Sequence, residues 1–189
     1  IGACAMAGFF VYLAGSPFVL INHYKLSSTQ YSLAFALNSV AFIGAAQFNG
    51  KLGQRFGLVR VVKGAALASG VVMLSMLAYY WAGGDELAVL IVLYFIASAF
   101  MGLVIPTTSV LALEAHGAIA GTASALLGTL QMLAGAVAMQ LVGHFSNGKP
   151  LPMVAGMALG ALMGVALAWI TLSHKSTHAA LGDSLDHKA

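Results

Sequence analysis

Six long stretches of the sequence contain almost no charged side chain, and this feature limits the fold more than any other. A helix needs about 20 mostly apolar residues to cross a hydrocarbon core of roughly 30 Å. Charged residues make up only 7% of the 189 residues. A soluble domain uses about a quarter of its residues to cover its surface with charge, so a soluble fold is excluded. We therefore expect an all-α membrane protein, a bundle of six transmembrane helices.

The expected transmembrane helices occupy residues 1–21, 31–48, 61–82, 87–113, 118–142 and 153–172. Short connections join these spans, as in a compact bundle, so that residues 1–173 form one transmembrane domain. Residues 174–189 form a polar tail, which we expect to be disordered and cytoplasmic. The sequence begins inside an apolar stretch and without a methionine, so we also expect that its N-terminus is cut.

The lysine and arginine residues predict the orientation, because cytoplasmic loops carry them in excess. Six of the eight fall on one side of the predicted topology and two on the other. The six are Lys51, Arg55, Arg60, Lys63, Lys175 and Lys188, and the two are Lys25 and Lys149. We therefore expect the loop over residues 49–60 and both ends of the chain in the cytoplasm.

None of the five acidic residues lies well inside a predicted span. Buried ionisable groups usually mark proton or ion pathways in membrane proteins. The chain therefore carries no recognisable proton relay of its own. A single cysteine, Cys4, excludes an internal disulfide, and no zinc-ligand spacing is present.

Uncharged polar side chains occur at middle depth in the first, second, fourth and fifth spans. Tyr12 and Ser16 lie four residues apart and share a helix face. The amides of Asn38 and Gln131 would cost free energy in hydrocarbon unless they meet a partner or water. We therefore expect such residues to face the bundle interior, either bonded to another helix or in contact with a substrate.

Two prolines interrupt the predicted helices. Pro106 removes a backbone hydrogen bond and should bend the fourth span. The carbonyl that it frees is expected to line a cavity or to be bonded by a hydroxyl of residues 107–109. Pro17 should kink the first span in its outer third.

Small residues form stripes on the last two spans. Gly156, Gly160 and Gly164 recur every four residues and would let another helix approach closely. The stripe predicts packing inside the bundle, or alternatively a dimer face. A similar strip on the fifth span comprises Gly121, Ser124 and Gly128.

Three segments resemble known transporters. The sequence from Gly50 to Gly57, followed by Arg60, resembles the cytoplasmic motif of the major facilitator superfamily (MFS), with Gln54 where the motif prefers Asp. Residues 12–19 resemble the seventh helix of the Bcr/CflA drug-resistance transporters, and residues 120–131 resemble their eleventh. That family usually has Pro-Asn in its tenth helix, whereas this chain has Pro106 followed by Thr.

The resemblance implies that the chain is the C-terminal half, helices seven to twelve, of a twelve-helix transporter. Each half of such a protein is built of two inverted three-helix repeats, and the substrate lies between the halves. The first, second, fourth and fifth helices would line the cavity, and the third and sixth would be peripheral. The missing N-terminal half would supply the proton-coupling acids, and the protein would lie in a bacterial inner membrane.

The predicted function is proton-coupled export of small amphipathic drugs, driven by the proton gradient and without any cofactor. Aromatic and methionine surfaces would bind the drug loosely and amides would orient it. The expected substrate-binding residues are Phe9, Tyr12, Ser16, Asn38, Phe42, Tyr94, Ser98 and Gln131. The expected gating residues are Gly50, Arg55, Gly57 and Pro106, with Arg55 capping neighbouring helix ends. The expected partners are the lipid bilayer, the substrate and the N-terminal half, with no nucleic acid and no metal.

Two alternatives belong to other classes. A complete six-helix intramembrane protease would need a histidine inside the membrane, whereas all six histidines fall in loops, at helix ends or in the tail. We therefore expect no enzymatic activity. A six-helix channel or a structural membrane subunit is the remaining alternative.

Overall fold

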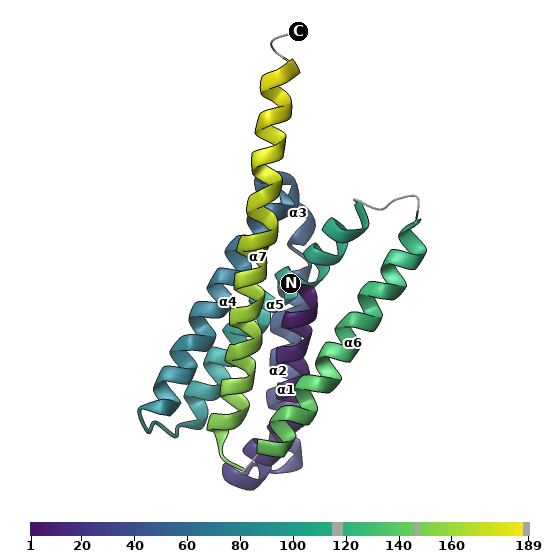
Figure 1. Ribbon diagram of the computed structural model, residues 1–189. Helices are drawn as coiled ribbons and strands as arrows, with labels where there is room; N and C mark the ends of the chain where they lie inside the picture. Colours follow the sequence, from purple (N-terminus) through teal and green to yellow (C-terminus); the bar gives the residue numbers. More distant parts are fainter. Residues whose placement is uncertain (115–118, 146–147, 187–189) are drawn as a thin grey trace.

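The computed structural model describes residues 1–114, 119–145 and 148–186, with side chains described as far as Leu172. The described residues are helical almost throughout, and six helical segments are long and apolar enough to cross a membrane (Figure 1). The elements are α1 (Gly2–Pro17), η1 (Phe18–His23), α2 (Ser28–Ala46), α3 (Asn49–Phe56), α4 (Leu58–Trp81), α5 (Leu87–Glu114), α6 (Ala120–Phe145) and α7 (Pro150–Asp186). The predicted all-α, six-span fold is confirmed.

Helix α2 begins three residues before the expected start of the second span, because its first turn is capped. The Ser27 hydroxyl accepts a hydrogen bond from the backbone N–H of Gln30, and the Gln30 side chain accepts one from the backbone N–H of Ser27. This reciprocal pair satisfies two backbone donors that the start of a helix leaves without partners. The helix start is therefore fixed by two polar residues that a hydropathy pattern places in a loop.

The connection expected over residues 49–60 contains a helix of its own, α3. Its backbone hydrogen bonding continues that of α2, with the N–H of Leu52 donating to the carbonyl of Phe48 over 2.9 Å. Gly57 ends α3 with a φ of 82°, a conformation that favours glycine, and α4 begins at the next residue. The expected loop was wrong because a short helix with few apolar residues gives no hydropathy signal.

Two other boundaries differ from the expectation for local reasons. The first span continues beyond Pro17 as a π-helix to His23, whose last bond runs from the N–H of Tyr24 to the carbonyl of Val19. Helix α7 continues through the segment expected to be a disordered tail as far as Asp186, and it extends beyond the bundle in Figure 1. No proline interrupts residues 153–186, so nothing in the sequence stops the helix there. Residues 187–189 lie outside the described residues.

The packing of the helices has an internal symmetry. Helix α1 packs against α6 and α7, helix α5 packs against α2 and α4, and α4 packs against α7. Exchanging α1 with α5, α2 with α6 and α4 with α7 reproduces the same set of neighbours. This pattern is what two three-helix repeats, α1–α2–α4 and α5–α6–α7, would produce. It places α1 and α5 in equivalent central positions.

The glycine stripe of α7 packs inside the bundle. A Cβ on Gly160 would lie 3.1 Å from the carbonyl oxygen of Cys4 and 3.3 Å from the backbone nitrogen of Gly8. The backbones of α7 and α1 therefore approach closely there, as small residues allow. By contrast, a Cβ on Gly121 or Gly128 of α6 would meet no atom within 4 Å. The strip on α6 has no partner among the described residues.

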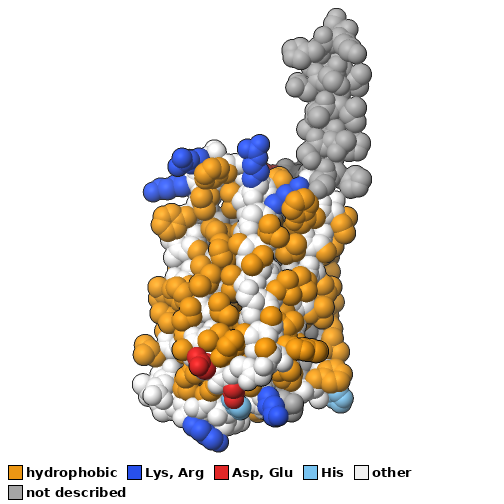
Figure 2. Space-filling view, turned by 90° about the vertical axis from the view of Figure 1, so that its left-hand side faces the viewer, with side chains coloured by type: hydrophobic (Ala, Val, Ile, Leu, Met, Phe, Trp, Pro, Cys, Tyr) orange, Lys and Arg blue, Asp and Glu red, His pale blue; other side chains and the backbone are white. Residues whose placement is uncertain are grey.

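Charged side chains gather at the two ends of the bundle, and an apolar belt separates them (Figure 2). Lysine and arginine dominate the end that carries α3, whereas acidic, histidine and lysine side chains share the opposite end. The belt is made of large apolar side chains that the bundle leaves exposed, which suits a hydrocarbon environment and not water. For convenience we call the α3 end the inner end and the opposite end the outer end.

Candidate functional site

A hollow of about 390 Å³ lies between α1, α2 and α5. Five aromatic rings and two methionines contribute to its wall, together with one amide and two serines, and no charged side chain does. We call it the aromatic hollow. Its lining comprises Met6, Phe9, Tyr12, Phe35, Asn38, Ser39, Phe42, Ile43, Tyr94, Ser98, Met101 and Ile105.

Helical periodicity explains why these residues meet. On each of the three helices the lining residues recur every three or four positions, with Phe9 and Tyr12 on α1 as one example. Six of the eight predicted substrate-binding residues lie in this wall: Phe9, Tyr12, Asn38, Phe42, Tyr94 and Ser98. Helix α6, expected to line the cavity, contributes none of the residues that line the aromatic hollow.

The centre of the wall is an interhelical contact among Tyr12, Asn38 and Tyr94, all of them buried. The Asn38 Nδ2 donates a hydrogen bond to the hydroxyl oxygen of Tyr12 over 3.0 Å. The rings of Tyr12 and Tyr94 stack with their centroids 3.8 Å apart and their planes inclined by 18°. One residue from each of three helices therefore fixes the shape of the wall.

This contact leaves hydrogen-bonding capacity unused. The Asn38 Oδ1 is buried and has no hydrogen-bond partner among the described residues. Tyr12 accepts the hydrogen bond from Asn38 with its hydroxyl oxygen, so its hydroxyl proton is not used in that bond. Turning the amide over would exchange these roles and still leave one amide atom unbonded. A buried polar atom without a partner costs about 1–3 kcal/mol, and a bound molecule with a matching group would remove that cost.

Two predicted binding residues lie elsewhere. Ser16 is fully buried, and its hydroxyl lies 3.2 Å from the hydroxyl of Tyr31, so it bonds α1 to α2 on the outer side of the hollow. Gln131 lies where α1, α5 and α6 meet: a Cβ on Gly2 would come within 3.0 Å of its Nε2 and 2.8 Å of the Thr108 Oγ1. The Gln131 Nε2 is buried and has no hydrogen-bond partner among the described residues.

Sequence analysis missed half of the wall, because it singled out polar residues and a few aromatic ones. The missed residues are Met6, Phe35, Ser39, Ile43, Met101 and Ile105. Each lies within one or two helical turns of a predicted residue, as Phe35 lies three residues before Asn38. Extending every predicted polar residue along its own helix face would have found them.

The predicted gating residues lie around α3 and in α5. Gly50 and Arg55 are exposed, and the Arg55 guanidinium carbon lies 5.3 Å from the centre of the Phe56 ring. Gly57 forms the turn into α4, and Pro106 lies inside α5 one residue beyond Ile105 of the hollow. The capping role of Arg55 stays a prediction.

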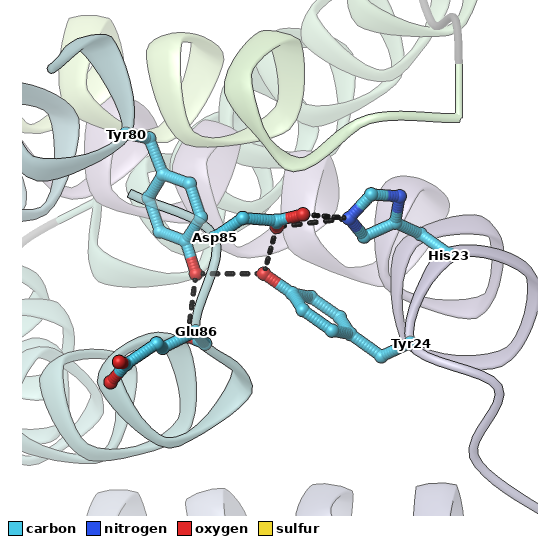
Figure 3. A network of polar contacts seen from close by, with 5 residues as sticks. All are labelled: His23, Tyr24, Tyr80, Asp85 and Glu86. Carbon is cyan, nitrogen blue, oxygen red and sulfur yellow. Dashed lines mark hydrogen bonds and ion pairs between the residues drawn. The ribbon is translucent and has the colours of Figure 1, made fainter. Parts of the chain in front are cut away.

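A second polar cluster lies at the outer end, where η1 meets the α4–α5 connection (Figure 3). The Nε2 of His23 lies 2.7 Å from an Asp85 carboxylate oxygen, and the Tyr24 hydroxyl donates to the other oxygen over 2.8 Å. The Tyr80 hydroxyl donates to the backbone carbonyl of Glu86 over 3.0 Å and lies 3.1 Å from the Tyr24 hydroxyl. The hydroxyls of Tyr24 and Tyr80 have two protons for these three contacts. Because the proton of Tyr24 goes to Asp85, the proton of Tyr80 is shared between the Glu86 carbonyl and the Tyr24 hydroxyl. We call these five residues the outer network.

The outer network is charged, unlike the aromatic hollow. The hydrogen bond from Tyr24 lowers the pKa of Asp85 below its ordinary 3.8, against the smaller opposing effect of burial, and His23 adds to the lowering. Burial, followed by the contacts with Tyr80 and Asp85, raises the pKa of Tyr24. Asp85 is therefore ionised and Tyr24 is protonated at neutral pH, so a carboxylate accepts a hydrogen bond from a hydroxyl donor.

The histidines do not form a catalytic or metal site in the part of the chain whose side chains are described. His23 belongs to the outer network and His144 is exposed at the end of α6. Within those residues no three His, Cys, Asp or Glu side chains lie close enough to hold a metal ion. His116 and His187 lie outside the described residues.

Comparison with known proteins finds one informative relative. The chain is 34% identical over 160 residues to an uncharacterized MFS-type transporter, YdgK, from Bacillus subtilis (strain 168). The match covers 83% of the present chain, which spans about two fifths (39%) of the length of that relative. No family model matches the chain. No solved structure matches it either. The six apolar helices and this similarity together support a multi-pass membrane protein.

Proposed function

We propose that this chain is the C-terminal six-helix half of an MFS-type transporter, and that its aromatic hollow is part of the substrate pathway. The similarity to an MFS-type transporter over 160 residues supports the first part of the proposal. The exchange symmetry of the helix contacts supports it independently, since it is what two three-helix repeats would produce. The motif-like segment from Gly50 to Gly57 lies at the end of the bundle where lysine and arginine dominate, as the cytoplasmic motif of that superfamily would.

The observation that carries the substrate pathway is the unused hydrogen-bonding capacity of Asn38 and Tyr12 within an aromatic wall. A hollow of about 390 Å³ suits a small molecule. The aromatic rings favour a flat apolar body, and Asn38 with Tyr12 favours a ligand that carries a hydrogen-bond donor and acceptor. The wall holds no cation to balance an anionic ligand, whereas the faces of its aromatic rings attract a cationic one.

The substrates that fit this chemistry are small amphipathic compounds, and we propose drug export as the activity. The resemblance of residues 12–19 and 120–131 to Bcr/CflA transporters supports this choice. Because the hollow has no carboxylate in its wall, the residue that couples transport to the proton gradient would lie in the other half. Transport, and not catalysis, is therefore the proposed role of this chain.

The partner of this chain would be a second six-helix half seated against α2 and α6. These two are the least buried of the six spans. The strip through Gly121 and Gly128 on α6 meets nothing within 4 Å, so it leaves room for another helix. The proposed location is a bacterial inner membrane, with the arginine- and lysine-rich inner end in the cytoplasm.

An efflux assay on cells that express the full-length protein tests this proposal. We expect it to expel an uncharged aromatic probe such as chloramphenicol and a flat cationic one such as ethidium, and to leave fluorescein, an anion, inside. A protonophore should abolish the efflux. Equal efflux of all three probes, or efflux that persists without a proton gradient, would contradict the proposal.

A matched pair of variants tests whether the hollow is the pathway. Asn38→Leu removes the free amide, whereas Ser39→Ala alters a neighbouring lining residue whose hydroxyl donates to its own helix, to the carbonyl of Phe35. We expect Asn38→Leu to reduce efflux of the uncharged probe and Ser39→Ala to leave it near normal. The same efflux from both variants would show that the hollow is not on the pathway.

A further inference from the structure

The break in α5 at Pro106 leaves one backbone carbonyl without its usual donor. In an α-helix the N–H of residue 106 would bond the carbonyl of residue 102, and proline has no N–H. The structure supplies a substitute from another helix: the Asn49 Nδ2 donates to the Gly102 carbonyl over 3.0 Å. Asn49 therefore takes the place of the missing backbone donor.

The other end of the same amide is also bonded. The Thr107 Oγ1 donates to the Asn49 Oδ1 over 3.0 Å. Asn49 thus holds α5 on both sides of Pro106, at Gly102 before the proline and at Thr107 after it. The hydroxyls of residues 107–109 were expected to bond the freed carbonyl, and none does, since Thr108 and Ser109 donate to carbonyls of residues 104 and 105.

The position of this amide connects two regions of the molecule. Asn49 is the first residue of α3, the helix that contains Arg55 and ends at the turn of Gly57. Gly102 lies between two residues of the aromatic hollow, Met101 and Ile105. It also marks a close approach of α5 to α2, because a Cβ there would overlap the backbone carbonyl oxygen of Phe42. A change at α3 would therefore reach the inner part of the hollow through one side chain.

We propose that Asn49 is a positioning residue that spans the proline break of α5 and ties it to the first turn of α3. The tie holds Met101 and Ile105 in register and so sets the shape of the inner end of the hollow. Its consequence for transport, that movement of α3 is transmitted to the substrate wall, rests on the proposed function. The tie itself does not.

A double-mutant cycle between Asn49 and Pro106 tests the tie in the full-length protein. Asn49→Leu should shorten the half-life of the detergent-solubilised protein at a fixed elevated temperature by about three- to tenfold, because it leaves the Gly102 carbonyl unbonded. In the Pro106→Ala background the same change should have a smaller effect, equal to that of Thr107→Val, since the alanine N–H bonds that carbonyl and only the Thr107 bond is lost. Asn22→Leu, at an exposed asparagine of η1, is the control for the substitution itself.

A gentler variant keeps the test valid if Asn49→Leu does not fold. Asn49→Asp retains the acceptor for Thr107 and, as a carboxylate, loses the donor to Gly102. It should show the same dependence on Pro106, whereas Thr107→Val should shorten the half-life equally with and without the proline. If Asn49→Asp had the same effect with Pro106 in place and in the Pro106→Ala background, the proposal would be overturned.

Thiol labelling measures the shape of the hollow directly. In a Cys4→Ser background, a cysteine introduced at Ile105 should react with a small methanethiosulfonate at a rate that Asn49→Leu changes by about threefold or more, as the loss of one interhelical bond would allow. Pro106→Ala should restore the original rate and Asn22→Leu should not alter it. An unchanged rate in Asn49→Leu would overturn the proposal. Neither the cycle nor the labelling measures transport, so a protein with an intact tie and no efflux would contradict the proposed function alone.

Discussion

Helices α1 and α5 occupy equivalent places in the two repeats, and each contains a proline toward its C-terminal end, Pro17 in α1 and Pro106 in α5. In α1 the six residues after Pro17 form a π-helix, and this π-helix ends in the outer network. In α5 the helix continues as an α-helix, and the carbonyl freed by Pro106 is bonded by Asn49. The proline is therefore followed by a change of helix type in one case and bridged by a side chain from another helix in the other.

The two helices also differ in what lies closest to each of them near its proline. Near Pro17 the close neighbour of α1 is a flexible side chain, because a Cβ on Gly15 would meet the side chain of Met153 at 2.8 Å. Near Pro106 the close neighbour of α5 is the backbone of α2 at Phe42. We infer that α1 can adjust at its break and that α5 cannot, so the shape of the aromatic hollow depends mainly on α5.

The largest expected effect comes from adding one methyl group at each close approach. Gly102→Ala should lower the stability of the bundle by about 3 kcal/mol, the upper part of the range for overpacking, because two backbones must separate. Gly15→Ala should cost less than about 1 kcal/mol, because Met153 can change its rotamer. Thermal unfolding of both purified variants measures this, and equal losses would remove the distinction between the two helices.

A smaller effect is expected at the contact between the two helices. Tyr94→Leu removes a ring of the wall, one that stacks on Tyr12 at 3.8 Å, and it should weaken binding of an aromatic probe by about fivefold, since an aromatic contact with the probe contributes about 1 kcal/mol beyond its buried area. Tyr79→Leu, on α4 and outside the hollow, is the matched control. Quenching of protein fluorescence by the probe gives the affinities. Equal affinities of the two variants would contradict the assignment of the hollow as the binding site.

The outer network should make a modest, pH-dependent contribution at the end of the first span. The folded-state pKa of Asp85 is below 3.8, so its stabilising effect is present above that pH and is lost as the pH falls through the lowered pKa. In a His23→Gln background, Asp85→Asn should lower the melting temperature by a constant amount between pH 5 and pH 8. The difference in melting temperature between the proteins with Asp85 and with Asn at this position should narrow below pH 4. A difference that disappears already at pH 6 would show that the carboxylate does not titrate as the contacts require.

The smallest expected effect is at Ser16, which lies next to Pro17. Ser16→Ala removes one hydrogen bond of 3.2 Å to Tyr31 and should cost about 0.5–1 kcal/mol, without changing probe binding. Tyr31→Phe removes the same bond from the other side and should give a similar loss. If Ser16→Ala lowered the free energy of probe binding by more than it lowered the free energy of unfolding, Ser16 would belong to the substrate-binding wall.

Much of the fold follows from the sequence because the bilayer imposes a simple rule. Length and lack of charge were enough to find six spans, and Tyr12, Asn38 and Tyr94 at middle depth did turn inward. Hydropathy could not find α3, which is a polar helix, or the π-helix after Pro17, because an α-helix and a π-helix have the same hydropathy.

The candidate site was harder to predict, because a helix face is known from periodicity but its neighbour is not. Phe9 and Tyr12 share their face of α1 with the hollow, whereas Ser16, four residues beyond Tyr12, meets Tyr31 instead. Asn49 was overlooked because its two partners on α5 are 53 and 58 positions away in the sequence. Nothing local distinguishes that asparagine from one in a loop.

The central claim is that the aromatic hollow, with its free amide oxygen, holds the ligand. The most direct measurement is protection of a cysteine placed at Ser98 in the wall, in a Cys4→Ser background, with a cysteine at the exposed Ser28 as the reference. An uncharged aromatic probe at ten times its Kd occupies about 90% of the protein, so it should slow labelling at position 98 about tenfold, and it should leave position 28 unchanged. Labelling of position 98 at the same rate with and without the probe, while the probe binds the protein, would contradict the account.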